Sequence, residues 1–81
     1  MKIPRDLSGV KLAKQLKKLG YQVSRQSGSH LRLTTTHGGQ HHLTVPNHDP
    51  IKVGTLSDIL NDVAKHFQTT RDDIIHRLFE N

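Results

Sequence analysis

Two stretches of alternating side chains, separated by a pair of glycines, constrain this chain more than any other feature. Residues 31–34 and 42–45 alternate apolar and polar side chains, as strands with one buried face do, and the glycines at 38–39 predict a hairpin between them. Pairing Leu33 with Leu43 keeps every apolar side chain on one side of the sheet, whereas a shift by one residue sends the two sets to opposite faces. We therefore expect an odd-length loop or a bulge, with a glycine in the left-handed conformation.

The same register predicts a polar face on the other side of the sheet. The side chains that alternate with the apolar ones point away from the core; they are His30, Arg32, Thr34, His42 and Thr44. A further strand is expected before them, because Tyr21 and Val23 alternate with polar residues and would share a buried face. The Ser-Gly-Ser turn at 27–29 connects this strand to His30.

Three other segments have the periodicity of amphipathic helices. Ser8 can cap a helix over about residues 9–19 that stops at Gly20. Thr55 is expected to cap a second helix, with an acid three residues later as in a capping box, and a short third helix is expected after Thr70. The second helix has the clearest apolar stripe, formed by Leu56, Ile59, Leu60, Val63, Ala64 and Phe67.

The order helix, three strands, helix, helix predicts an α+β fold. Each main helix has one apolar stripe and the sheet has one apolar face, so the simplest architecture packs the helices on one side of a three-stranded antiparallel sheet. Residues 46–54 contain two prolines and a glycine and should be irregular. We expect a single domain over residues 1–81, in which residues 61–81 form a C-terminal helical extension.

Positive charge is concentrated at the start of the chain. Residues 1–32 contain eight lysines and arginines against one aspartate, whereas residues 55–81 contain three against five acids. Lysines occupy the polar side of the first expected helix, at Lys11, Lys14, Lys17 and Lys18. Such a basic face is typical of proteins that bind nucleic acids, although a solvated helix face accounts for some of these lysines equally well.

Composition excludes several classes of protein. The chain has no cysteine, so disulfide frameworks and thiolate metal sites are excluded. It has no apolar run near the length of a membrane span and no signal-peptide core, so a cytoplasmic protein without membrane contact is the default expectation. A core built from 81 residues is too small for a deep pocket, so any site should lie on an open surface.

The seven histidines suggest a metal site, but their spacing does not favour one. A zinc site needs three or four converging ligands, and His41 and His42 would point to opposite faces of a strand. We therefore expect no metal and no cofactor. His30 differs because it follows Gly28 and Ser29 and lies beside Arg32 on the open face.

Histidine suits RNA cleavage by transesterification, since it can act as the base or the acid while a cationic side chain contacts the phosphate. The alternative for His30 is an ordinary histidine next to a turn, hydrogen-bonded to the backbone.

Several short motifs occur together in a characteristic order. They are PRDLSGVKLAKQLKKLGYQVSRQSGSHLRL, then LTVPNH, then KVGTLSDIL. From about Ile3 to Leu60 the chain resembles the HicA (YcfA-like) family of bacterial toxin mRNA interferases. Residues 61–81 extend past the usual end of that family.

The resemblance implies a fold like that of double-stranded-RNA-binding domains, with the order α-β-β-β-α. It implies that His30 is the catalytic residue of an RNA-cleaving toxin that blocks translation, and that a HicB-type antitoxin covers the active site and represses the operon. We expect a toxin that is monomeric when free. The alternatives are a non-catalytic RNA-binding module of the same fold and an interaction protein that acts only through its partner.

The remaining site assignments come from charge and placement. The residues expected to contact RNA are Lys11, Lys14, Lys18, Arg25, Ser29, Arg32 and His48. The second catalytic group beside His30 stays open between His48, His42 and Arg32.

Overall fold

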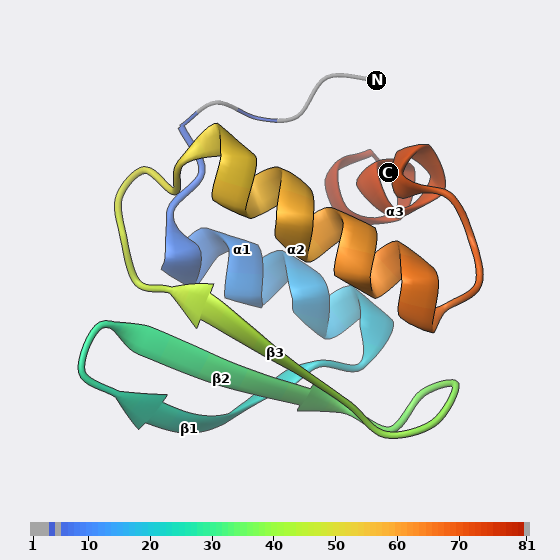
Figure 1. Cartoon of the computed structure of the whole chain (residues 1–81), viewed down its shortest axis with the longest axis horizontal. Coiled ribbons are helices and arrows are strands. Elements are labelled where there is room, and N and C mark those ends of the chain that lie inside the picture. Colours follow the sequence, from blue (N-terminus) through green and yellow to red (C-terminus); the bar gives the residue numbers. More distant parts are fainter. Residues whose placement is uncertain (1–3, 5, 81) are drawn as a thin grey trace.

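The computed structural model of the protein describes residue 4 and residues 6–80; Ile3, where the resemblance begins, lies outside them. A three-stranded antiparallel sheet in the order β1-β2-β3 forms one layer, and the helices cover one of its faces (Figure 1). The elements are α1 (Gly9–Leu16), a 3₁₀ turn η1 (Lys17–Leu19), β1 (Gln22–Ser27), β2 (His30–Thr35), β3 (His41–Pro46), α2 (Val53–His66) and α3 (Arg71–Phe79). The predicted α+β architecture, with α-β-β-β-α followed by a short C-terminal helix, is confirmed. None of the helices in the described part of the chain combines the length and the apolarity needed to cross a membrane.

Two of the three predicted helix starts are confirmed. The Ser8 hydroxyl accepts a hydrogen bond from the Lys11 N–H at 3.1 Å, and the Thr70 hydroxyl accepts one from the Asp73 N–H at 3.1 Å. The first helix also stops as predicted, because Gly20 adopts a left-handed φ of 87° after the 3₁₀ turn.

The predicted cap of the second helix is wrong. α2 begins at Val53, two residues before Thr55, and its N-cap Lys52 makes no side-chain capping bond. The reason for the earlier start lies in Ile51, the residue before the N-cap. Ile51 is buried, at 3% exposure, and its N–H donates to the Leu7 carbonyl at 2.8 Å, so the chain is already fixed there and turns into the helix at once.

The β2–β3 hairpin has the register that the sequence predicts. Leu33 lies opposite Leu43, and Leu31 lies opposite Val45. The connection at 36–40 has an odd number of residues, and both of its glycines have positive φ, 68° and 103°.

The predicted buried face of β1 is wrong. Tyr21, just before the strand, is fully buried, but every residue of β1 is exposed, and Val23 keeps 45% of its surface accessible. A β-bulge shifts the pairing between Val23 and Arg25, which interrupts the alternation of faces. In addition, α1 does not pack tightly against this edge strand: a pocket of about 280 Å³ lies between the helix and β1.

Both layers contribute to one hydrophobic core. Leu33 and Val45 of the sheet, Leu12 of α1 and Leu60 of α2 are fully buried in it. α3 adds three further buried side chains, Ile74, Ile75 and Leu78. The C-terminal helix therefore fills part of the same core as α1 and α2.

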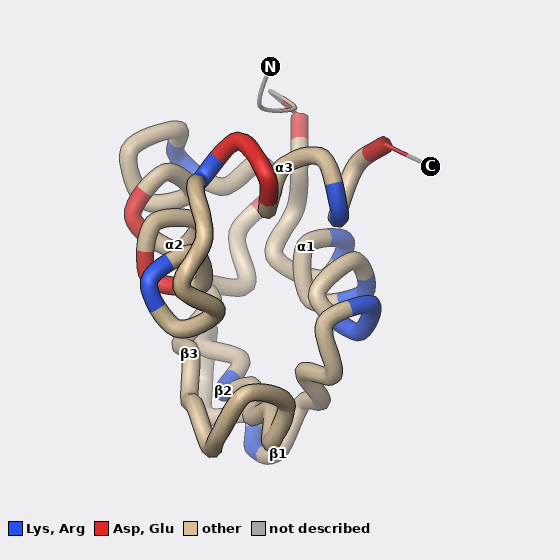
Figure 2. Tube along the Cα trace, turned by 90° about the vertical axis from the view of Figure 1, so that its right-hand side faces the viewer, with Lys and Arg blue, Asp and Glu red and all other residues tan. Residues whose placement is uncertain are grey.

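Charge is divided between the two sides of the helical layer. Figure 2 shows lysines along α1 and acidic residues on α2 and at the start of α3. The lysines at 11–18 thus lie on one side of the helical layer, and the acidic residues of α2 lie on the other.

Gly9 joins the start of α1 to the end of β3, so replacing it should destabilise the fold. A Cβ at this position would overlap the Pro46 carbonyl oxygen and come within 3.0 Å of the Asn47 Cα. We expect Gly9→Ala to lower the free energy of unfolding by about 1–3 kcal/mol. Gly54→Ala is the matched control, because a Cβ there meets nothing within 4 Å and the helix should gain up to about 1 kcal/mol. Urea denaturation of both variants measures the difference; equal stabilities would contradict this close approach.

Candidate active site

His30 is positioned by a tight turn and by two neighbouring strands. It is the first residue of β2 and pairs with Ser27 of β1 on one side and with Pro46 of β3 on the other. The turn between Ser27 and His30 needs a residue with positive φ, and Gly28 supplies it at 56°. His30 therefore occupies the end of the central strand, where the backbone on both sides is fixed by pairing.

The open face of the sheet has a shallow pocket around His30. Its volume is about 290 Å³, and it is lined by Arg25, Ser27, His30, Arg32 and Thr44. Arg32 is the cross-strand partner of both Arg25 and Thr44, so all three strands contribute to this part of the face. An imidazole and two guanidinium groups thus share one exposed pocket, which suits an anionic ligand.

His42 shares this face but lies at a distance from the pocket. Its Nδ1 is 2.9 Å from the Thr34 hydroxyl, which is 3.0 Å from the Ser24 hydroxyl. Thr34 is four residues along β2 from His30, or about 13 Å at the rise of a strand. The sequence predicted Ser24 as a polar residue facing away from the core but did not predict its contact with Thr34, which lies ten residues further along the chain.

Ser29 and His48 connect neighbouring segments through their backbones. The Asn47 N–H donates to the Ser29 carbonyl at 2.6 Å, and the Gly9 N–H donates to the His48 carbonyl at 2.9 Å. These bonds fasten the residues after β3 to the turn before His30 and to the start of α1. Neither residue lines the pocket around His30.

The lysines of α1 and η1 form a group apart from that pocket. They lie on the helical layer, away from the open face of the sheet (Figure 2). Lys14 and Lys17 line the gap between the helix and β1, whereas Lys18 donates from its Nζ to the Leu78 carbonyl at 2.9 Å. Lys18 therefore holds the end of α3, a contact that the sequence could not reveal because the partners are far apart in the chain.

Three of the other histidines join the β2–β3 loop to α2. The His41 ring stacks on the His66 ring with centroids 4.4 Å apart, and the His66 Nε2 donates to the His37 carbonyl at 2.9 Å. His41 also lies between two further groups, with its Nδ1 2.8 Å from the Tyr21 hydroxyl and its Nε2 3.4 Å from an Asp62 oxygen. Within the part of the chain that the structure describes, no three His, Asp or Glu side chains converge to hold a metal ion.

A family comparison covers the site just described. The model of the family described as HicA toxin of bacterial toxin–antitoxin matches residues 9–64, which run from the start of α1 into the last turn of α2 and include the whole pocket around His30. Comparisons with curated proteins and with solved structures gave no significant match.

Tyr21 should make the stability of the protein fall at high pH. Burial, and secondly the negative charge of Asp62, raise the pKa of Tyr21 well above its ordinary value of 10.0. Because the folded state keeps the phenol protonated after the unfolded state has lost its proton, Tyr21 should cost about 1.4 kcal/mol of stability per pH unit above pH 10.

The chain has a single tyrosine, so its absorbance near 295 nm reports this ionisation directly. The phenolate band should appear together with unfolding, and Tyr21→Phe should remove its share of the loss in stability. A phenolate band in the folded protein near pH 10 would contradict the expectation.

Proposed function

Because the chain belongs to the HicA family of toxins from bacterial toxin–antitoxin systems, we propose that it is a ribonuclease that cleaves mRNA and thereby inhibits translation, with His30 as its catalytic residue. The observation that supports this proposal best is the pocket in which His30 lies with Arg25 and Arg32. An RNA phosphate bound there would contact the guanidinium groups of Arg25 and Arg32, and the adjacent ribose 2′-hydroxyl would face the imidazole of His30.

The reaction that fits this pocket is transesterification of RNA. The 2′-oxygen attacks the adjacent phosphorus, the bond from phosphorus to the 5′-oxygen breaks, and a 2′,3′-cyclic phosphate and a 5′-hydroxyl are formed. His30 takes the proton of the 2′-hydroxyl as general base. Arg25 and Arg32 stabilise the negative charge that develops on the non-bridging oxygens.

The 5′-oxygen must gain a proton as it leaves. Of the side chains that line the pocket, only that of His30 is of a type that commonly serves as acid or base in catalysis. His42 lies about 13 Å along the strand, too far to reach the same phosphate. His30 is exposed, so solvent can donate the second proton. Arg32 then acts through its charge, and His48 is left as a contact to flanking RNA.

Binding of RNA would combine the pocket with the basic helix. Lys11 and Lys14 lie on the helical layer and the arginines lie on the sheet, so a bound strand would pass around the β1 edge to reach both groups. Contacts of this kind go to phosphates and 2′-hydroxyls, and they read shape more than sequence. Ser29, in the turn before His30, lies where such a strand would cross.

The partner of the toxin in this proposal is a HicB-type antitoxin. The exposed position of the pocket makes inhibition by a covering protein straightforward, since nothing in the described residues shields His30. The proposed place of action is the cytoplasm, where mRNA is translated.

His30→Ala should reduce the rate of RNA cleavage by at least about 100-fold, the effect of removing a general base. His42→Ala is the matched control, because it removes an exposed histidine from the same face and should leave cleavage within a few-fold of the parent. The measurement is the appearance of 2′,3′-cyclic phosphate ends on a messenger RNA incubated with each protein. Equal loss of activity in both variants would contradict the assignment of His30.

The same experiment tests the alternative of a non-catalytic RNA-binding module. If the parent protein binds the RNA but leaves it intact, the protein is a binding module and His30 is one of its contacts. Growth arrest on expression, abolished by His30→Ala, would separate a toxin from such a module.

Neutralising Lys11 and Lys14 together should weaken the dependence of RNA binding on salt. Each lost phosphate contact reduces the slope of log K against log salt by about 0.7–0.9, so Lys11→Gln with Lys14→Gln should reduce it by about 1.4–1.8. Lys18→Gln is the control, because its amino group is bound to Leu78 and should affect stability instead of the slope. Filter binding at several salt concentrations measures the slope for the double variant and for Lys18→Gln. An unchanged slope in the double variant would show that Lys11 and Lys14 are only solvated.

A further inference from the structure

β1 is an unpaired sheet edge. It has β2 on one side only, and among the described residues no backbone hydrogen bond joins it to any other element. All of its residues are exposed. A free edge of this kind presents alternate N–H and C=O groups that can pair with another strand, and proteins normally cover or interrupt such edges.

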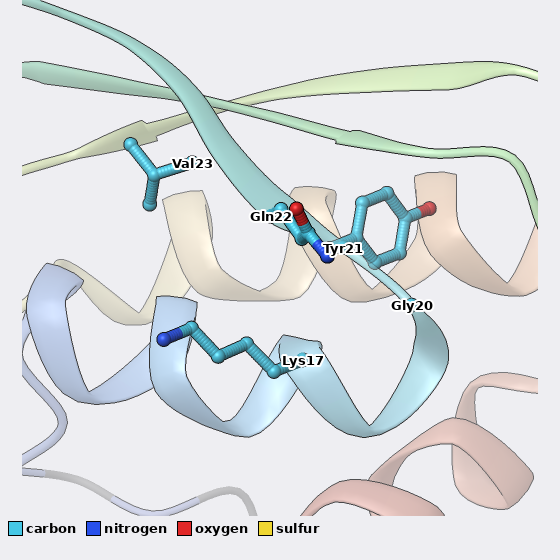
Figure 3. Close-up of a pocket in the computed structure, with 5 residues that line it drawn as sticks. All are labelled: Lys17, Gly20, Tyr21, Gln22 and Val23. Carbon is cyan, nitrogen blue, oxygen red and sulfur yellow. The ribbon is translucent and has the colours of Figure 1, made fainter.

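A groove follows this edge on the helical side of the sheet. One part, of about 280 Å³, is lined by buried side chains of Ala13 and Leu31 and by the exposed Val10 and Val23. An adjoining part, of about 400 Å³, continues past Tyr21 to Gly20 and shares Val23 with the first (Figure 3). Val10 is 56% exposed and Val23 45%, so two valines from different elements border one groove without a partner.

The charges around this groove are of one sign. Lys14 and Lys17 line it, and the Lys17 side chain extends along the helix in the direction of Val23 (Figure 3). The sequence has no acid between residues 7 and 48, and no acidic residue lines either part of the groove. Acidic residues are found on α2 and at the start of α3 (Figure 2). The groove therefore fits a ligand that carries both negative charge and apolar surface.

These features favour a polypeptide over RNA. RNA would satisfy the lysines but would leave the valines and the backbone edge of β1 unmatched. An extended peptide meets all three, because its backbone pairs with β1 while every second side chain, about 7 Å apart, faces α1. At the other sheet edge, β3, the apolar residues Leu43 and Val45 are already buried, so they offer no exposed apolar side chain to a bound peptide.

We propose that an acidic segment of a partner protein binds along β1 as a fourth strand, with an apolar side chain between Val10 and Val23 and carboxylates at Lys14 and Lys17. The proposal rests on the proposed function for its reason, since a toxin requires an inhibitor. Arg25 and Ser27 of β1 line the pocket of His30, so a strand bound at this edge would flank the catalytic pocket directly.

The test uses an acetylated ten-residue peptide with threonine at every second position and valine and glutamate in turn at the positions between, so that valine and glutamate point to the same face. The control peptide has lysine in place of glutamate. Titration of the whole protein, followed by NMR and amide hydrogen exchange, should show binding of the acidic peptide alone and slower exchange at alternate amides of Gln22–Ser27. Val23→Asp should weaken binding at least tenfold. Val53→Asp is the matched control, because Val53 is a similarly exposed valine, at 59%, on α2 and should leave binding unchanged.

Three results would overturn the proposal: no peptide binding, binding that leaves the β1 amides unprotected, or equal binding by the two aspartate variants. Protection of the β1 amides by a twelve-residue oligouridine, weakened by Val23→Asp, would assign the groove to RNA and would also overturn it. RNA cleavage is measured in parallel. Active protein that fails to bind the peptide contradicts this inference alone, and inactive protein that binds it contradicts the proposed function alone.

Discussion

The pairing of Leu33 with Leu43 is the constraint on which the rest of the structure depends. It sends the apolar side chains of β2 and β3 to the helical layer, and it thereby leaves His30 and Arg32 on the opposite face. A small domain can bury only one face of a three-stranded sheet with so few helices. The same pairing that builds the core thus leaves a polar face free, and the candidate site occupies it.

Most of this arrangement could be predicted from the sequence, because it follows from local periodicity. The hairpin register, the caps at Ser8 and Thr70 and the apolar stripe of α2 all depend on residues close together in the chain. The errors arose where distant contacts decide. Thr55 is a suitable cap by its side chain, but the burial of Ile51 against Leu7 starts the helix earlier.

The site shows the same division between local and distant effects. The placement of His30 beside Arg32 follows from alternation along β2, and it could be predicted. The bulge after Val23 and the gap that α1 leaves beside this residue have no signal in the sequence. The sequence places Lys18 with the other lysines of one expected helix, whereas its hydrogen bond to the Leu78 carbonyl depends on the packing of α3 and has no local signal. The assignments of His30 and of the RNA contacts stay predictions that rest on chemistry and on the family.

The burial of α3 has a consequence for the order in which the fold is completed during synthesis. Ile74, Ile75 and Leu78 fill the core beside α1 and α2, yet they follow the segment shared with the family. During synthesis the pocket strands leave the ribosome well before these side chains do. The core is completed only when α3 has emerged, so the sheet that holds the pocket has its full hydrophobic support only after residues beyond the family segment have been made.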